Sequence, residues 1–360
     1  MKKIIALMMV MALLVAGCSS TSTTTETTST PAETSSEATT TETQTLVLST
    51  FGLSDDVSED EIYKPFEEAF NADIVTETGN ASERFTKFSS DAQSTIDVIE
   101  LSQSKTAEGV EAGLFEAIDT SQIENYDNLI DSAKALVEAG AGVPYTMNSL
   151  VIVYNPEAVD AIASYDDLWS EALANQISIP EITTTFGPSM VYIASEHAGV
   201  DVTSDEGAAA FEALAALKGN IVKTYSKSSD LVNMFTSGEV NAAVVGDYAV
   251  PILKAANENL VFVTPDAAYG NFNTININKN SANKELAYDY INYRISAELQ
   301  KTAASALSNA PTNKLVELTE EEAGTMPYGD AANALKSIDY TFVNPLLSNW
   351  VDLWNRTLNN

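Results

Sequence analysis

Residues 142–155, Gly-Val-Pro-Tyr-Thr-Met-Asn-Ser-Leu-Val-Ile-Val-Tyr-Asn, contain the strand around which the rest of the chain is organised. Its core, residues 150–154, is apolar and β-branched, and Asn155 and Pro156 end it. A strand without a polar face is buried on both sides, as in the middle of an α/β sheet. Short apolar runs alternate with helical patterns on both sides of this stretch. We therefore interpret it as a crossover between two lobes, the alternative being a central strand of one large domain.

The N-terminus has the pattern of an export signal. Lys2 and Lys3 precede an apolar run at residues 4–15, which is too short to span a membrane. Residues 14–18, Leu-Val-Ala-Gly-Cys, resemble the lipobox of bacterial lipoproteins, and Cys18 is the only cysteine in the chain. We predict a signal peptide at residues 1–17 and lipidation of Cys18, which would hold the protein at the cell membrane. The alternative is a plain signal peptide with a chance cysteine.

Residues 18–44 and the body of the chain differ sharply in composition. The first segment is nearly all Ser, Thr, Glu and Ala, which cannot bury enough apolar surface to fold, so we predict a flexible tether. The remaining residues are globular in composition, and the whole chain carries a formal net charge of -33. Such a charge disfavours nucleic acid and anionic headgroups as partners and favours cationic ligands. We expect membrane contact only through the lipid.

The segment before the central strand alternates strands with helical patterns. Strands are predicted from Thr45 and at residues 73–77 and 96–101, with a helix that has Ser58 as a possible N-cap and a helix at residues 82–90. This βαβ order predicts a mostly parallel sheet, and such sheets bind ligands beyond the carboxyl ends of their strands. The residues expected to line one side of a cleft are therefore Thr50, Phe51, Ser102 and Gln103.

The segment after the central strand repeats the pattern. Strands are predicted at residues 177–180, 240–248 and 260–265, and residues 271–277 are expected to return to the first lobe. Helices are predicted at residues 190–198, 206–218, 229–237, 285–295 and 297–304. By the same strand-end argument, Asp247 and Tyr248 are expected to line the opposite side of the cleft.

The order of several local phrases resembles the solute-binding proteins of bacterial ABC importers, especially the spermidine/putrescine-binding group and its iron- and thiamine-binding relatives. These phrases are Val-Tyr-Asn-Pro at 153–156, Tyr-Asp-Asp-Leu-Trp at 165–169, Phe-Thr-Ser-Gly-Glu-Val at 235–240 and Ala-Pro-Thr-Asn at 310–313. The resemblance implies a two-lobed periplasmic-binding-protein-like fold of type II that closes on its ligand by hinge motion. It places lobe 1 at residues 45–147 and 277–310, and lobe 2 at 148–276 and 311–360. It also implies a monomer outside the cytoplasm that works with a permease and an ATPase and needs no cofactor.

The predicted ligand site departs from the polyamine-binding pattern. Threonines stand at 183–185 where that pattern has carboxylates, and Asp247 is the one acid in a matching loop. Asn271 and Asn273 stand where the pattern has a Trp and, two residues on, an Asp, so the resemblance implies that both belong to the ligand site. We favour an amine-bearing solute, similar to a polyamine or thiamine, with Asp247 as its charge partner. The alternatives are a phosphonate- or phosphate-like anion bound by Thr184 and Thr185 at a helix start, and iron.

Enzymatic function is not expected. His197 lies near the end of a predicted helix, where a surface position is the simpler interpretation. The sequence lacks Cys/His metal spacing, a phosphate-loop glycine pattern and a Gly-x-Ser-x-Gly elbow, so we assign no catalytic or metal-binding residues. The remaining rival is a surface lipoprotein without a transport role.

Overall fold

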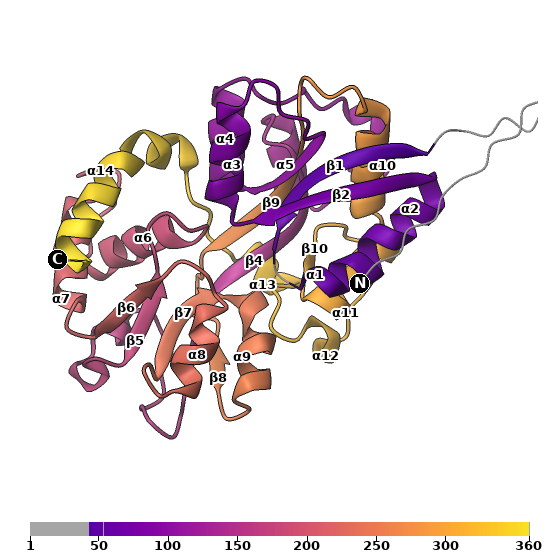
Figure 1. Ribbon diagram of the computed structural model, residues 1–360. Helices are drawn as coiled ribbons and strands as arrows, with labels where there is room; N and C mark the ends of the chain where they lie inside the picture. The colour runs from indigo at the N-terminus through magenta and orange to yellow at the C-terminus, as the bar shows by residue number, and fades with distance from the viewer. Residues whose placement is uncertain (1–42, 53, 360) are drawn as a thin grey trace, which may run out of the picture. The chain divides into compact units, whose positions relative to one another are not determined.

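A computed structural model describes residues 43–52 and 54–359 (Figure 1). The predicted signal peptide, Cys18 and almost all of the predicted tether lie outside the described residues. The tether prediction extended to residue 44, but Gln44 is already the first residue of strand β1. The folded body therefore begins one residue earlier than the sequence pattern indicated.

Lobe 1 is built on one half of a continuous sheet, in which the strand order is β2-β1-β3-β9-β4. Strands β1, β2 and β3 are parallel, whereas β9 runs antiparallel to both β3 and β4. The prediction of parallel pairing is therefore confirmed for the outer strands, and the two long connecting strands make the sheet mixed. The bounds are β1 Gln44–Phe51, β2 Ala72–Gly79, β3 Val98–Ser102, β4 Val143–Tyr154 and β9 Gly270–Ile277.

Alternating residues of the lobe 1 strands pack against helices on opposite faces of the sheet. Val98 joins a core with helices α2, α5 and α10, whereas its neighbour Ile99 packs with α3 on the other face. The bounds are α2 Lys64–Phe70, α3 Ala81–Ser90, α4 Gln103–Glu111, α5 Asp131–Glu138, α10 Lys284–Arg294 and α11 Ala297–Leu307. Helix α3 covers the predicted segment 82–90 and begins at the N-cap Asn80.

The first helical segment differs from its prediction. It begins at Asp55, in helix α1 Asp55–Ser58, and Ser58 lies within it without capping any amide. A π-helical turn, Glu59–Tyr63, then leads into α2 directly before Pro65. Proline lacks the N–H that an α-helix interior needs, and the wider turn accommodates its ring without ending the helix.

Strand β4 is the crossover that its sequence predicted, and all of its twelve residues are buried. Its first half pairs with β9 and with the short strand β10, Ala310–Pro311. Its second half, from Leu150, pairs with β7 and β8. One strand therefore runs through the sheets of both lobes, as Figure 1 shows for β4.

Lobe 2 is built on the second half of β4 and on β7, β5 and β6, in that order. Helices α6, α7 and α14 pack on one face of these strands, and α8 and α9 pack on the other. The strand bounds are β5 Ile177–Pro180, β6 Ile221–Tyr225, β7 Ala242–Gly246 and β8 Val261–Val263. The helix bounds are α6 Gly187–His197, α7 Ala208–Leu217, α8 Asp230–Thr236, α9 Val250–Ala256 and α14 Tyr340–Leu358. Short helices α12, Glu320–Ala323, and α13, Asp330–Asn333, precede α14.

Strand pairing suggests lobe boundaries that differ from those predicted from the sequence. All of β9 pairs within lobe 1, including Asn273, which faces Ser102 and Thr146. Residues after Pro311 also bond to lobe 1, since Thr312 and Asn313 donate to Gln300. We therefore propose that the second connection crosses at residues 264–269 and the third near residues 329–336, instead of at 276 and 310.

Helices long and apolar enough to cross a bilayer are absent from the described part of the chain.

Candidate functional site

A cavity of about 600 Å³ lies between the two lobes. Its walls come from the carboxyl ends of β1, β3, β5 and β6 and from the first turns of the helices that follow them. Seven of the ten predicted ligand-binding residues line it. These are Thr50, Phe51, Ser102, Thr184, Thr185, Tyr248 and Asn273.

The lobe 2 wall is rich in hydroxyl groups. It contains residues 183–185, which lead into α6, and residues 226–229, which lead into α8. Gly187 allows the first of these loops to fold tightly onto the helix, because a Cβ at this position would lie 2.2 Å from the carbonyl oxygen of Glu181. Lys227 is an exposed cavity-lining cation, and no hydrogen bond or ion pair is found for its side chain within the described chain.

The lobe 1 wall faces this loop with the start of helix α3. Asn80 caps the helix by accepting a hydrogen bond from the amide of Glu83 at 2.9 Å. Ser82 donates across the cavity mouth to the carbonyl oxygen of Thr183 at 2.9 Å. This hydrogen bond connects the two lobes, so the two walls are in contact at the mouth of the cavity.

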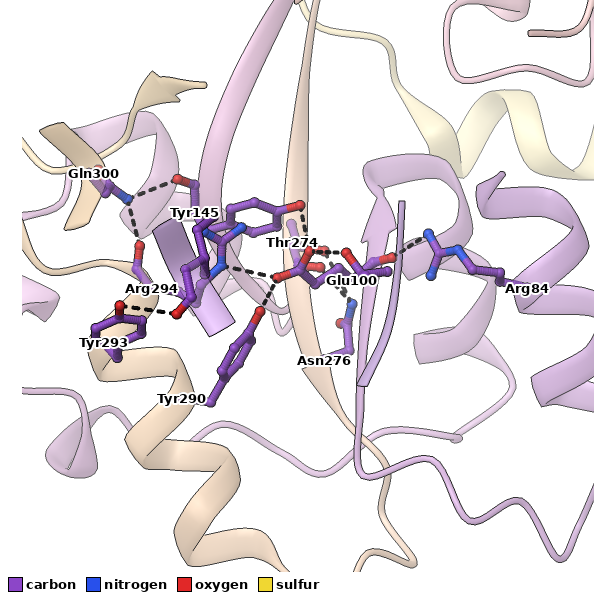
Figure 2. A network of polar contacts seen from close by, with 11 residues as sticks. Arg84, Glu100, Tyr145, Thr274, Asn276, Tyr290, Tyr293, Arg294 and Gln300 are labelled. Carbon is purple, nitrogen blue, oxygen red and sulfur yellow. Dashed lines mark hydrogen bonds and ion pairs between the residues drawn. The ribbon is translucent and has the colours of Figure 1, made fainter. Parts of the chain in front are cut away.

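The floor of the cavity is a buried polar network centred on Glu100, which Figure 2 shows from close by. One carboxylate oxygen, Oε2, accepts from Thr50 Oγ1 at 2.6 Å and from the Tyr145 hydroxyl at 2.9 Å. The other, Oε1, accepts from the Tyr290 hydroxyl at 2.8 Å and from Arg294 Nε at 3.2 Å. Glu100 thus has donors at both oxygens.

The charges of this network keep Glu100 ionised. Burial would raise the pKa of Glu100, but the positive charge of Arg294 and the hydroxyl donors outweigh burial and hold that pKa below its ordinary value. A second guanidinium, Arg84, donates to the Glu100 carbonyl oxygen at 2.8 Å, and burial lowers the pKa of Arg84 to about 10. Two buried cations therefore lie near one buried carboxylate, and of the two Arg294 donates to its oxygens, whereas Arg84 binds the backbone carbonyl.

Asp247 does not line the cavity, contrary to the sequence prediction. It begins a 3₁₀ turn after β7, which directs its side chain back toward the crossover strand. There it accepts from Ser149 N at 3.0 Å, from Ser149 Oγ at 3.1 Å and from Tyr248 N at 2.8 Å. Asp247 is fully buried, and this desolvation raises the pKa of its carboxyl to about 7 despite these donors. Its hydrogen bonds to Ser149 link lobe 2 to β4, and its side chain does not face the cavity.

Gln103 and Asn271 are also outside the cavity lining. Gln103 accepts from the amide of Phe272 at 2.9 Å, and Asn271 donates to Asn273 Oδ1 at 3.0 Å. Both side chains thus stabilise the junction of α4 with β9. They hold Asn273, which does line the cavity.

Sequence reasoning missed the charged residues of the cavity floor. Glu100 lies in the apolar run 96–101 and Arg294 in the helical pattern 285–295, and both were assigned only to their elements. A charged residue within a buried strand is a usable signal, since it needs a partner. That partner could not have been found from spacing, because Arg294 lies far along the chain.

His197 is part of the surface of lobe 2. Its ring stacks on Trp169 with centroids 4.0 Å apart, and Nδ1 lies 2.9 Å from Asp166 Oδ1. Groups of three or more His, Cys, Asp or Glu side chains able to hold a metal ion are absent among residues 43–52 and 54–359.

The fold and cavity define a class: two α/β lobes that share crossover strands and enclose a cavity between them are typical of solute-binding proteins. Residues 61–327 match the family described as bacterial extracellular solute-binding protein. A solved ABC transporter structure from Clostridium perfringens ATCC 13124 is 50% identical, with a TM-score of 0.77, and the match covers 87% of this chain and 100% of that one. The chain belongs to this extracellular solute-binding family.

More distant structures share the fold. The spermidine/putrescine substrate-binding protein PotD from Streptococcus pneumoniae strain Canada MDR_19A is 21% identical, with a TM-score of 0.72 and coverage of 86% and 98% of the two chains. MotA from A. tumefaciens B6, solved with glucopine, is 17% identical, with a TM-score of 0.73 and coverage of 87% and 99%. A search of curated proteins gave no match. The protein is thus the substrate-binding component of an ABC transporter, acts outside the cytoplasm and is not an enzyme.

Proposed function

We propose that this protein captures a small polar solute carrying an anionic group and delivers it to a membrane permease and its ATPase. The observation that supports an anion is the set of charged side chains that line the cavity. The cations are Lys105, Lys227 and Arg294, and the acids are Glu83 and Glu100. Arg294 and Glu100 form an ion pair, and Lys105 pairs with Glu108, so Lys227 is the lining cation for which the described chain shows no ion pair.

The preference for an amine-bearing solute depended on Asp247 facing the cleft. Because Asp247 is fastened to Ser149 instead, a bound ammonium group would have only Glu83 as a carboxylate with free oxygens in the lining. The hydroxyl-rich loop 183–185 at the start of α6 supports the anionic alternative, since helix N-termini attract anions. Capture works by closure: contacts with both lobes stabilise the closed state relative to the open one.

The test is to identify the solute that copurifies with the protein from its native host, using mass spectrometry of the denatured sample. We expect a compound with a carboxylate, phosphonate or phosphate group. Thermal denaturation with succinate, γ-aminobutyrate and putrescine, which have two, one and no carboxylates, provides a second measurement. A copurified solute that bears amines and no acidic group would refute the anionic proposal.

We further propose that lipid on Cys18 anchors the protein to the membrane. The support is the lipobox-like sequence at residues 14–18. Cys18→Ser should move the protein from the membrane fraction to the soluble fraction while its melting temperature stays unchanged. Full membrane retention of this variant would show that the anchor is not lipid on Cys18.

A further inference from the structure

We infer that Arg294 forms an oxyanion subsite at the lobe 1 end of the cavity, where its two terminal nitrogens bind a carboxylate or phosphoryl group of the solute. This inference rests on the proposed function and assigns the anionic group to one place in the cavity.

The first argument is the direction of the Arg294 side chain. The residue is only 4% exposed, yet it lines the cavity. Its Nε donates to Glu100, but no hydrogen bond is found for Nη1 or Nη2 within the described chain. Neither nitrogen belongs to the fully buried atoms that lack a partner, so both retain accessible surface. For a residue this buried, that surface faces the cavity.

The second argument is that the neighbouring groups have no capacity left for these nitrogens. Both oxygens of Glu100 are occupied by the donors of the floor network. Arg84 has only donors and cannot accept from these nitrogens, and its own three nitrogens donate to Gly79 O, Ser49 Oγ and Glu100 O. A buried donor without an acceptor is costly, and oxygens of an anionic solute would accept from these two nitrogens.

The third argument is geometry. The guanidinium carbon of Arg294 lies 4.3 Å from the centroid of the Tyr145 ring, and Nε is held by Glu100. Two fixed points orient the plane of the guanidinium, and its free edge can bind two oxygens of a carboxylate or phosphate side by side. The C-terminus of α11 also borders this end, and the negative end of a helix disfavours an anion. Two of its carbonyl oxygens are already occupied, since Ala303 O accepts from the amide of Asn309 and Ala304 O from the amide of Ser308.

The experiment uses selenate, an oxyanion that can be located by its anomalous scattering, soaked into crystals of three proteins. Glu100→Gln is the matched control, because it removes the acid and leaves Arg294 in place. The double variant Glu100→Gln with Arg294→Met removes both charges together, so that neither is left buried alone. We expect a selenate peak within hydrogen-bond distance of Nη1 and Nη2 in the wild type and in Glu100→Gln, and its loss in the double variant.

A second readout is the amount of copurified solute retained by each purified protein, measured by mass spectrometry. The double variant should retain at least tenfold less than Glu100→Gln at equal helix content by circular dichroism. Should the double variant not fold, Arg294→Lys keeps the charge beside Glu100 but loses the two-nitrogen edge, and it should also retain less solute. Selenate bound only at Lys227 or at exposed lysines, or unchanged solute retention, would overturn this inference. An anionic copurified solute would still support the proposed function in that case, whereas an amine without an acidic group would refute the function itself.

Discussion

Replacing Asp247 with Asn separates the roles of charge and hydrogen bonding at the junction between lobe 2 and the crossover strand. Burial raises the pKa of this carboxyl from 3.8 to about 7. The folded protein therefore binds a proton that the unfolded chain has released between pH 4 and pH 7. By linkage, the stability contributed by this group is fully present below the lower pKa and is lost as the pH rises through the upper one.

The magnitude follows from the size of the pKa shift. At about 1.4 kcal/mol per pH unit, the wild type should lose roughly 3 kcal/mol of unfolding free energy through Asp247 between pH 5 and pH 8. Asp247→Asn has no titrating group at this position and should not show that loss. The variant should also bind solute as tightly as the wild type, because Asp247 lies outside the cavity lining.

Urea denaturation of both proteins at pH 5 and pH 8 measures this difference, and Asp160→Asn, at an exposed carboxylate of the same lobe, is the matched control. The control should keep the pH dependence of the wild type. Equal pH dependence of Asp247→Asn and the wild type would show that the donors from Ser149 and Tyr248 keep the carboxylate ionised in spite of its burial. Loss of solute binding in Asp247→Asn would instead show that Asp247 contributes to solute binding.

Three further outcomes are expected. Gly187→Ala should lower the melting temperature and weaken solute binding, since its Cβ would lie 2.2 Å from the Glu181 carbonyl oxygen; an unchanged protein would show that this loop adapts freely. Ser82→Ala should weaken solute binding by roughly 0.5–1.5 kcal/mol, because it removes the hydrogen bond that joins the lobes at Thr183. Solute should also compact the protein in X-ray solution scattering by favouring closure, and identical curves with and without bound solute would argue against hinge motion.

The sequence predicted the elements of the fold well because their signals are local. The apolar run 150–154 identified the crossover, and the predicted strand at 177–180 coincides with β5, Ile177–Pro180. The helix at 297–304 was also recognised, although α11 continues to Leu307. Where the chain crosses between lobes was harder to predict, since crossing depends on which distant strand pairs with residues such as Asn273.

The sequence predicted where the candidate site lies better than it predicted which side chains face the cavity. Strand ends such as Thr50 and Ser102 do line the cavity, because the end of a strand fixes where a residue lies. Side-chain direction depends on the turn that follows, and the 3₁₀ turn at Asp247 reversed the expected direction. The pairing of Glu100 with Arg294 joins two elements far apart in sequence, so neither residue alone indicated the floor network.

The position of β9 in the sheet also determines when the protein can fold during its synthesis. Strand β9 lies between β3 and β4, although it follows β4 by more than a hundred residues in the chain. A nascent chain that ends before Gly270 therefore has an incomplete lobe 1 sheet, in which β3 and β4 expose unpaired edges. Contacts of such long sequence separation form slowly, because the intervening loop must close first. Lobe 1 can therefore complete its sheet only after most of the chain has been made, and an incompletely folded polypeptide is the form that a translocation channel can thread through a membrane.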